Sequence, residues 1–416
     1  MSQDTQRPLK IAFLHKALLY GGAERLILDM ALAFKEQSHT VSIYTCEYDK
    51  EKTFPDFQTS GVTIKRVGKY IPARIKGKFA ALFNLIRMFY LTMYLIISWA
   101  RFDLIVVDQI TLPIPLLRLF RYKVLYYCHF PEALLNDNKP TPLIKVYRAV
   151  MDFIESLCLR FGSVVCFNSN YTQENVEQTF PMMKKWKGYK KVVYPCMLPP
   201  PATLPQLEHG HLLPGKGKYL LSVNRFETRK KIDLCVEAFA LAIKQDKSFQ
   251  QSGLKLVLAG GLDRNNKDAI LCRKTLEELA IKLDVADRVV FRENISQEEK
   301  EVLLSNAFLF LYTPPNEHFG IGPLEAMIRS VPCLAINNGG PKETVENGET
   351  GFLLSLEAQE WTATILKLFN DKDLHTRLST QAKTRTWQKF SPETFGVHFK
   401  DILRELKLGP DKKKHN

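Results

Sequence analysis

The stretch "KIAFLHKALLYGGAERLILDMALAFKEQ", residues 10–37, contains an apolar run, a loop with two glycines and an amphipathic segment. The run at 10–15 is almost continuously apolar, which is typical of a strand buried on both faces of a parallel sheet. Apolar residues then recur at helical spacing over 23–37. A strand, a glycine loop and a helix in this order predict one unit of a doubly wound α/β domain.

The same alternation extends through both halves of the chain. The first half has strand candidates at 10–15, 40–45, 62–67, 103–108, 123–130, 163–169 and 191–195. After a stretch rich in Pro and Gly, the second half has candidates at 218–226, 254–261, 288–294, 308–314, 332–337 and 351–355. We therefore expect two doubly wound Rossmann-like domains facing across a cleft. The predicted segments are a first domain at 1–200, a linker at 201–217, a second domain at 218–390, and a C-terminal helix and basic tail at 391–416, starting at Ser391-Pro392.

The composition limits the classes of partner. Lys and Arg number 58 against 44 Asp and Glu, a net charge of +14, which favours phosphorylated substrates, acidic lipid headgroups or nucleic acid. We exclude nucleic acid because no zinc-finger spacing or aromatic-basic recognition motif is present. The eight cysteines form no CxxC pair, which favours reduced, buried thiols in a cytosolic compartment. The polar start "MSQDTQRPLK" predicts no secretory signal.

Residues 79–100, "FAALFNLIRMFYLTMYLIISWA", are apolar except for Arg87. The length would suffice to cross a bilayer, but Arg87 would cost roughly 2.5–3.5 kcal/mol near its centre. A single span would also separate residues 1–78 from the strands with which they form a sheet. We favour a helix at the membrane surface, with Arg87, Lys76 and Lys78 at the headgroup level, over a buried core helix.

Ligands of doubly wound domains bind at the carboxyl ends of the strands, and each motif that follows is expected there. In "NEHFGIGPLEAM", residues 316–327, Pro323 suits the first turn of a helix. Gly320 permits unusual backbone angles just upstream. Glu317 would lie at the start of this helix and Glu325 about one turn inside it. The two readings are a phosphate site flanked by two carboxylates, and a solvated helix start.

A second motif, "VNRFETRKKIDL", follows the first strand of the second half. Arg225, with Lys230 and Lys231, can clamp a diphosphate from two sides. We expect the Arg225 and Lys230 side chains to be exposed. The alternative is a solvated basic loop, which the position after a strand disfavours.

Three further features are weak when taken singly. Gly21 and Gly22 allow close approach of a phosphate or sugar, or form a tight turn. His129, after "YYC", could orient a sugar hydroxyl or support a leaving group, or be an ordinary buried histidine. Gly339 and Gly340 open a ligand-facing loop or only punctuate the chain.

Together, and in this order, these motifs make the chain resemble the family 4 glycosyltransferases, retaining enzymes of the two-domain GT-B fold. The resemblance covers nearly the whole chain, and its most diagnostic part is the pair Glu317 and Glu325. The strings "YYCHFPEALL" and "TPPNEHFGIGPLEAM" resemble most the family members that add alpha-1,3 and alpha-1,6 mannose in dolichol-linked oligosaccharide assembly (asparagine-linked glycosylation).

The resemblance implies roles for the motif residues. Arg225 and Lys230 would bind the donor diphosphate and Glu325 the ribose hydroxyls. Glu317 would contact the transferred sugar on its reacting face, with His129 near the reacting centre. The remaining donor-binding positions implied are Gly22, Lys231, Phe319 and Gly320. Relatives often have glycines where this chain has Asn224 and Lys231, which leaves open whether Lys230 or Lys231 lies closer to phosphate.

The implied function is transfer of mannose from GDP-mannose, as donor substrate, to a dolichol-diphosphate oligosaccharide at the cytosolic face of the endoplasmic reticulum membrane. The membrane surface and other mannosyltransferases of the pathway are the further partners implied. Fixed cations stabilise a departing phosphate, so no metal and no cofactor is expected. The alternatives are a transferase using a UDP-sugar such as UDP-N-acetylglucosamine, and a non-catalytic sugar- or phosphate-binding scaffold.

Overall fold

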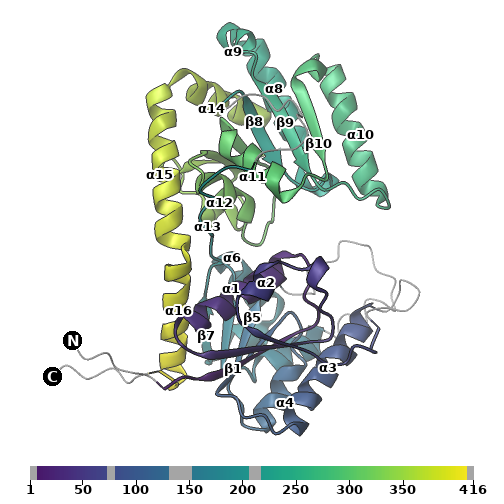
Figure 1. The fold of residues 1–416 in the computed structure, drawn as a ribbon. Coiled ribbons are helices and arrows are strands. Elements are labelled where there is room, and N and C mark those ends of the chain that lie inside the picture. Colours follow the sequence, from purple (N-terminus) through teal and green to yellow (C-terminus); the bar gives the residue numbers. More distant parts are fainter. Residues whose placement is uncertain (1–6, 73–79, 131–151, 206–216, 410–416) are drawn as a thin grey trace, which may run out of the picture. The chain divides into compact units, whose positions relative to one another are not determined.

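The computed structural model describes residues 7–72, 80–130, 152–205 and 217–409 (Figure 1). The chain divides into two units, the first formed by Met1–Cys196 with Pro392–Asn416 and the second by Met197–Ser391. Each unit contains one sheet in which every strand pair is parallel. The predicted α/β class with two doubly wound sheets is therefore confirmed.

The sheet of the first unit has seven strands in the order β3-β2-β1-β4-β5-β6-β7. Its strands are β1 (Lys10–His15), β2 (Thr40–Thr45), β3 (Thr63–Arg66), β4 (Leu104–Asp108), β5 (Val124–Cys128), β6 (Val164–Phe167) and β7 (Tyr189–Val192). Its helices include α1 (Gly22–Glu36), α2 (Asp56–Thr59), α3 (Ala80–Ile97), α4 (Pro113–Leu119), α6 (Asn170–Thr179) and α7 (Pro181–Lys184). Residues 152–159 are also helical.

Both faces of this sheet are covered, as the apolar runs predict. Ile11 and Phe13 of β1 lie in one buried cluster, whereas Ala12 and Leu14 lie in another. Because successive side chains of a strand point to opposite faces, two separate clusters mean two packed faces. A strand buried on both faces needs an apolar residue at every position, which explains the continuous apolar run.

The last helix of the chain, α16 (Pro392–Glu405), belongs to the first unit. It packs beside α1, as Figure 1 shows, and the ring of Phe399 lies 4.9 Å from that of Phe34. The predicted helix start at Ser391-Pro392 is confirmed, since α16 begins at Pro392.

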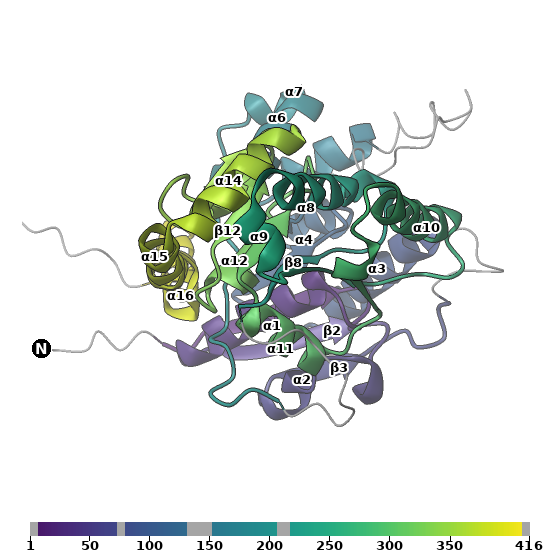
Figure 2. The same cartoon turned by 90° about the horizontal axis from the view of Figure 1, so that it is seen from above.

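The second unit has six strands in the order β10-β9-β8-β11-β12-β13. These are β8 (Tyr219–Val223), β9 (Lys255–Gly260), β10 (Val289–Glu293), β11 (Leu309–Tyr312), β12 (Cys333–Ile336) and β13 (Gly351–Leu354). The helices are α8 (Asp233–Gln245), α9 (Lys247–Gln251), α10 (Lys267–Lys282), α11 (Gln297–Asn306), α12 (Ile321–Met327), α13 (Pro341–Thr344), α14 (Ala358–Asn370) and α15 (Lys372–Phe390). Helix α8 packs beside α14 (Figure 2).

All thirteen predicted strands are present, with boundaries that differ by a few residues. The largest shift is at β7, predicted at 191–195 and found at Tyr189–Val192. All eight cysteines are free thiols. Several predicted features lie outside the described residues: Lys76, Lys78, linker residues 206–216 and the tail from 410.

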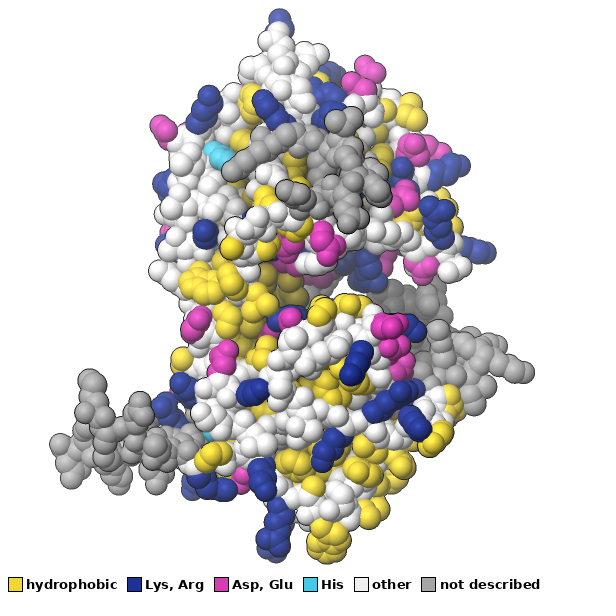
Figure 3. Space-filling model, in the orientation of Figure 1, with side chains coloured by type: hydrophobic (Ala, Val, Ile, Leu, Met, Phe, Trp, Pro, Cys, Tyr) yellow, Lys and Arg dark blue, Asp and Glu magenta, His cyan; other side chains and the backbone are white. Residues whose placement is uncertain are grey.

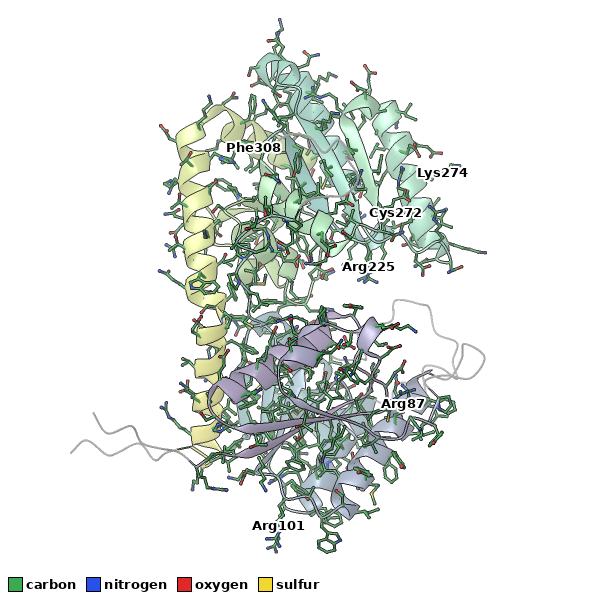
Figure 4. The ribbon with its side chains drawn as sticks, in the orientation of Figure 1. Arg87, Arg101, Arg225, Cys272, Lys274 and Phe308 are labelled. Atoms are coloured by element: carbon green, nitrogen blue, oxygen red, sulfur yellow. The ribbon has the colours of Figure 1, made fainter. Side chains whose placement is uncertain are left out.

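Helix α3 has two apolar faces. Met88, Leu91 and Leu95 are buried against the sheet, whereas Phe89 and Ile97 are exposed. The expectation for Arg87 was wrong, because its side chain is buried on the protein side. It forms an ion pair with Glu47 at 2.9 Å and donates to the Ile71 carbonyl at 3.1 and 3.0 Å (Figure 4). A guanidinium on an apolar helix thus finds its acceptors within the fold.

Within the described part of the chain, no helix combines the length and the apolar character needed to cross a bilayer.

Candidate active site

The predicted motifs all follow strands, at the carboxyl ends of the two sheets. Gly22 begins α1 after β1, and His129 directly follows β5. In the second unit, Arg225 comes two residues after β8 and Glu317 five residues after β11. The carboxyl ends of parallel strands lie at one edge of a sheet, so each unit gathers its motifs along one edge.

Lys230 and Glu317 form an ion pair in the second unit. The expectation that Lys230 is exposed was wrong, because the residue is 8% exposed. Its backbone carbonyl accepts a hydrogen bond from Thr313 Oγ1 at 2.8 Å, which fixes it next to the end of β11. Burial, and to a smaller extent the Glu317 carboxylate, raise the pKa of the Tyr312 hydroxyl well above its usual value. The ion pair between Lys230 and Glu317 therefore has a defined position next to the end of β11.

Lys231 differs from Lys230 in both backbone and exposure. It has a left-handed backbone, with φ of 52°, and closes the short 3-10 turn Thr228–Lys230. Its side chain is exposed, whereas that of Lys230 is directed to Glu317. The left-handed residue reverses the chain, so neighbouring lysines have different surroundings.

Arg225 lies at the end of β8 and is largely exposed (Figure 4). Its guanidinium lies 2.9 Å from the Glu227 carboxylate. The backbone just before it is held by Gly260, because a Cβ at position 260 would overlap the Asn224 carbonyl. Gly260 also has φ of 143°, so a side chain there would be strained as well. The backbone before Arg225 thus packs closely on Gly260, while the exposed Arg225 side chain reaches Glu227.

Glu325 lies in α12, as predicted, and has a partner that the motif does not contain. Lys300 Nζ of α11 is 2.6 Å from Glu325 Oε1. Lys300 therefore adds a third cation to the charged groups of this sheet edge. A ligand hydroxyl that binds Glu325 would share it with Lys300.

The loop that carries Glu317 packs directly on the glycine pair 339–340. The Gly340 amide donates to the Glu317 carbonyl at 2.7 Å, and a Cβ at position 340 would overlap the backbone of Phe319. Gly339 has φ of 65° and faces the same loop. The ring of Phe319 is buried against Phe390, with 5.8 Å between centroids, so a donor contact from Phe319 would come from its backbone.

Gly320, with φ of 84°, adopts the left-handed backbone that its position before a helix predicts. It gives α12 its start without a side-chain cap. Glycine is the residue that adopts this conformation at least cost.

In the first unit, His129 Nε2 lies 3.1 Å from Asp108 Oδ2. The other carboxylate oxygen, Asp108 Oδ1, lies 2.7 Å from Nδ1 of His15. His15 is fully buried, and its Nε2 lies 3.4 Å from Glu24 Oε1. His129 is therefore the outer end of a chain of four polar side chains.

These charges set the protonation of the buried groups. Burial disfavours the charged form of His15, but Asp108 and Glu24 outweigh it and raise the pKa of His15 to about 9. Burial likewise opposes ionisation of Asp108, yet the two histidines lower the pKa of that carboxyl below its ordinary value. At neutral pH an imidazolium and a carboxylate are thus paired inside the unit.

Gly22 has open space where a side chain would begin. A Cβ built at this position has no neighbour within 4 Å. The fold itself therefore does not require glycine at position 22.

Comparison with known proteins gives the family. Residues 20–186 match the model described as Glycosyltransferase Family 4, and residues 206–385 match that of Glycosyl transferases group 1. The alpha-1,3/1,6-mannosyltransferase ALG2 of Dictyostelium discoideum is 34% identical over 421 residues, covering 96% of this chain and 99% of that protein. The human protein of the same name is 33% identical, covering 92% of this chain and 93% of its own.

The chain belongs to the alpha-1,3/1,6-mannosyltransferase family. The resemblance to family 4 glycosyltransferases is confirmed, and the chain is a member of an enzyme family. Among solved structures, sucrose-phosphate synthase from Thermosynechococcus elongatus superimposes with a TM-score of 0.69, covering 96% of this chain and 99% of that one. At 19% identity this similarity concerns the fold alone, and it agrees with the GT-B class.

The motif residues of this glycosyltransferase have side-chain partners that the sequence analysis did not identify. Sequence reasoning missed His15, Glu24, Asp108, Glu227 and Lys300. His15 and Asp108 are the last residues of the predicted strands 10–15 and 103–108, so their position at the carboxyl ends of β1 and β4 was a usable signal. Lys300 stands among glutamates in α11 and carries no spacing signal.

In the described residues, no group of three or more His, Cys, Asp or Glu is arranged to hold a metal ion. The sequence contains one Asp-x-Asp triplet, Asp371-Lys372-Asp373. There Asp371 caps α15 by accepting from the Leu374 amide at 2.8 Å.

Proposed function

We propose that the protein transfers mannose from GDP-mannose to a dolichol-diphosphate-linked oligosaccharide, making alpha-1,3 and alpha-1,6 linkages with retention. The observation that carries this proposal is the near full-length similarity to relatives named alpha-1,3/1,6-mannosyltransferase. In support, the residues to which we assign donor binding follow strands in both units, where doubly wound domains bind their ligands. The donor base and the acceptor follow from the family.

The charged groups of the second unit suit departure of a nucleoside diphosphate. As the glycosidic bond breaks, negative charge grows on the phosphate and positive charge on the sugar. Arg225 and Lys230 supply fixed positive charge for the phosphate, in the role that a metal ion has elsewhere. Glu317, bound to Lys230, is then next to the bond that breaks and stabilises the sugar as it becomes positive.

Glu325 is assigned to the ribose hydroxyls and Gly22 to close contact with the donor phosphate or sugar. The open space at Gly22 supports this assignment, since no described residue lies within 4 Å of where a Cβ would be. Gly22→Ala should therefore leave folding unchanged and weaken donor binding.

The test is an assay of purified protein with GDP-mannose and a lipid-linked mannosyl-chitobiose acceptor, with product linkages determined by alpha-mannosidases of known specificity. We expect the acceptor to be elongated with GDP-mannose as donor and not with a UDP-sugar. Transfer from UDP-N-acetylglucosamine instead would establish the related transferase. Failure of both donors to react or hydrolyse would favour the binding scaffold.

We also propose that the protein works at the cytosolic face of the endoplasmic reticulum membrane, with the outer face of α3 on the lipid. This face exposes Leu82, Ile86, Phe89, Tyr90, Tyr94 and Ile97, and Trp99 just beyond it is 88% exposed. Helix α4 packs beside α3 and ends in the exposed Leu119 and Phe120. Figure 3 shows the hydrophobic side chains gathered over this part of the first unit.

Cations adjoin this apolar surface. Arg101 follows α3, and Arg118 and Arg121 flank the exposed end of α4. Figure 4 shows Arg101 at the edge of the first unit. Aromatic and aliphatic side chains with Arg beside them suit the boundary between acyl chains and anionic headgroups.

The membrane proposal is tested by flotation with vesicles that contain anionic lipid. Phe89→Ala with Ile97→Ala should weaken binding at least about tenfold, because two apolar side chains are lost from the contact. The matched control is Leu271→Ala with Ile281→Ala on α10, where two apolar side chains are 60% and 65% exposed. Equal effects of both pairs would contradict the assignment to α3.

A further inference from the structure

A chain of hydrogen bonds with a buried centre joins two elements of the first unit to which we assign ligand contacts. It runs from Glu24 through His15 and Asp108 to His129, with separations of 3.4, 2.7 and 3.1 Å. Asp108 is 1% exposed and His15 is fully buried. Glu24 lies in the first turn of α1, so the chain ends at the Gly21-Gly22 loop on one side and at His129 on the other.

Asp108 fixes which nitrogen of His129 carries a proton. Each of its oxygens accepts from one imidazole, and an ionised carboxylate can only accept. Nε2 of His129 must therefore be the donor to Asp108, which orients the ring. Nδ1, on the other edge of the ring, faces away from Asp108, where a substrate hydroxyl or leaving group could meet it.

His15 links Asp108 to α1. The groups that face it are Asp108 of β4 and Glu24 of α1, with His129 on the far side of Asp108. With a carboxylate at each nitrogen, its imidazolium donates in both directions. Asp108 therefore shares its single charge between two imidazoles.

Gly21 and Gly22 have different surroundings in the loop before α1. The Glu24 carboxylate lies where a Cβ of residue 21 would be. Gly21 has an extended backbone, with φ of −174°, so the backbone itself does not require glycine. Glycine at 21 instead gives Glu24 room to reach His15, while the space at Gly22 stays open.

We propose that Asp108, His15 and Glu24 are positioning residues that hold His129 in one tautomer and tie it to the Gly21-Gly22 loop. The proposal rests on the proposed transfer reaction for what His129 does, but the hydrogen-bonded chain is testable without that reaction. A purely structural buried cluster would stabilise the fold without setting the state of His129.

The first measurement is nitrogen NMR of the imidazoles in the full chain, which needs no substrate. We expect the Nε2-protonated form at His129 and a doubly protonated ring at His15. Asp108→Asn should change the His129 signal, because a carboxamide cannot accept from both rings. Unchanged His129 signals in a folded Asp108→Asn variant would overturn the proposal whatever the enzyme transfers.

The second measurement is kinetic. Asp108→Asn should lower kcat by about 10²–10⁴-fold, as loss of a buried aspartate that orients a histidine does elsewhere. Asp103→Asn is the matched control, since Asp103 precedes the same strand and bonds to Arg7 and the Lys10 amide. It should leave kcat unchanged. If Asp108→Asn lowers only the Tm and not kcat, the cluster is structural.

Glu24→Gln keeps the proposal testable if Asp108→Asn does not fold. Removing one of the two carboxylates at His15 should shift the alkaline limb of the kcat/KM profile to lower pH, because Glu24 helps to raise the pKa of His15. Gly21→Ala, which displaces the Glu24 carboxylate without straining the backbone, should give the same shift. An unchanged profile in both variants would overturn the link to α1. Inactivity of the wild-type protein with GDP-mannose would instead contradict the proposed function and leave the NMR result to stand.

Discussion

The two units place their candidate residues at equivalent sheet edges but hold them in different ways. In the first unit, His15 and Asp108 are almost completely buried and joined by directed hydrogen bonds. In the second unit, the cations at the sheet edge are partnered by carboxylates at the surface or only partly buried: Arg225 with Glu227, Lys230 with Glu317 and Lys300 with Glu325.

The difference indicates how each unit meets its ligand. A buried hydrogen-bonded chain keeps one geometry, because leaving any of its groups unpaired is costly. An ion pair near the surface exchanges its partner at small cost, because water compensates much of the charge. Arg225, whose side chain is 64% exposed, can therefore leave Glu227 for a diphosphate at small cost, whereas the first unit presents a fixed imidazole.

The largest expected effect comes from substituting Glu317, and it should differ in kind from the effect of substituting Glu325. Glu317→Gln should lower kcat about 10²–10³-fold with little change in donor KM, because its charge matters as the sugar becomes positive. Glu325→Gln should mainly raise donor KM, since the ribose contact is made equally before and during the reaction. Steady-state kinetics with donor varied measure both.

Glu346→Gln is the control for this pair, because Glu346 forms its ion pair with Arg385 of α15, at 2.6 Å, and has no assigned role in donor binding. It should match the wild type. If Glu325→Gln loses kcat and Glu317→Gln raises KM, the donor binds in the reverse direction.

Next in size is the contrast between Lys230 and Arg225. Lys230→Ala should lower kcat/KM about a hundredfold and Arg225→Ala about tenfold, the range for losing charge-assisted hydrogen bonds of different quality. The buried Lys230 has one available geometry, whereas the Arg225 side chain is 64% exposed.

Lys230→Ala should also lower the Tm, because Glu317 loses its partner, and the double variant with Glu317→Gln should recover part of that loss. Wild-type kinetics in both Lys230→Ala and Arg225→Ala would rule out the diphosphate clamp.

The comparison also explains what could be predicted from the sequence. Both sheets follow from apolar runs, because a strand buried on two faces leaves a continuous pattern. Glu317, Arg225 and His129 could be located because they follow such runs. The loop geometry gave local signals as well, such as Gly320 before α12.

Partners contributed by other elements could not be predicted. Lys300 reaches Glu325 from a separate helix, and Arg87 bonds to Glu47 forty residues away. Neither pair has a characteristic spacing in the sequence. The partners meet only because their helices and loops pack together in the fold. The burial of Lys230 was missed for the same reason, because charged residues are seldom buried unless a partner accompanies them.

A smaller effect concerns the pH dependence of stability. The pKa of His15 is about 9 in the fold and 6.5 in the unfolded chain. Its contribution, up to about 3 kcal/mol, is therefore fully present below pH 6.5 and is lost as the pH rises to 9. Hydrogen-exchange protection of β1 and β4 should fall over this range, whereas that of β8 and β11 should not follow it.

His15→Gln should remove this pH dependence from the first unit. His375→Gln is the control, because His375 lies in the second unit and contacts the Phe308 carbonyl at 2.9 Å. A wild-type pH dependence of β1 and β4 in the His15 variant would assign it to another group.

The smallest expected effect is that of metal removal. If Arg225 and Lys230 neutralise the departing diphosphate, kcat should be unchanged in EDTA, because the protein supplies the positive charge. The measurement is initial rate after exhaustive chelation, with and without added Mg²⁺ or Mn²⁺. Since Mg²⁺ also binds free nucleotide, GDP-mannose concentration must be saturating in every arm. Loss of activity in EDTA, restored by either ion, would mean that the ion pairs of the second unit stay paired during the reaction. The cations would then be structural, and the contrast with the fixed imidazole of the first unit would disappear.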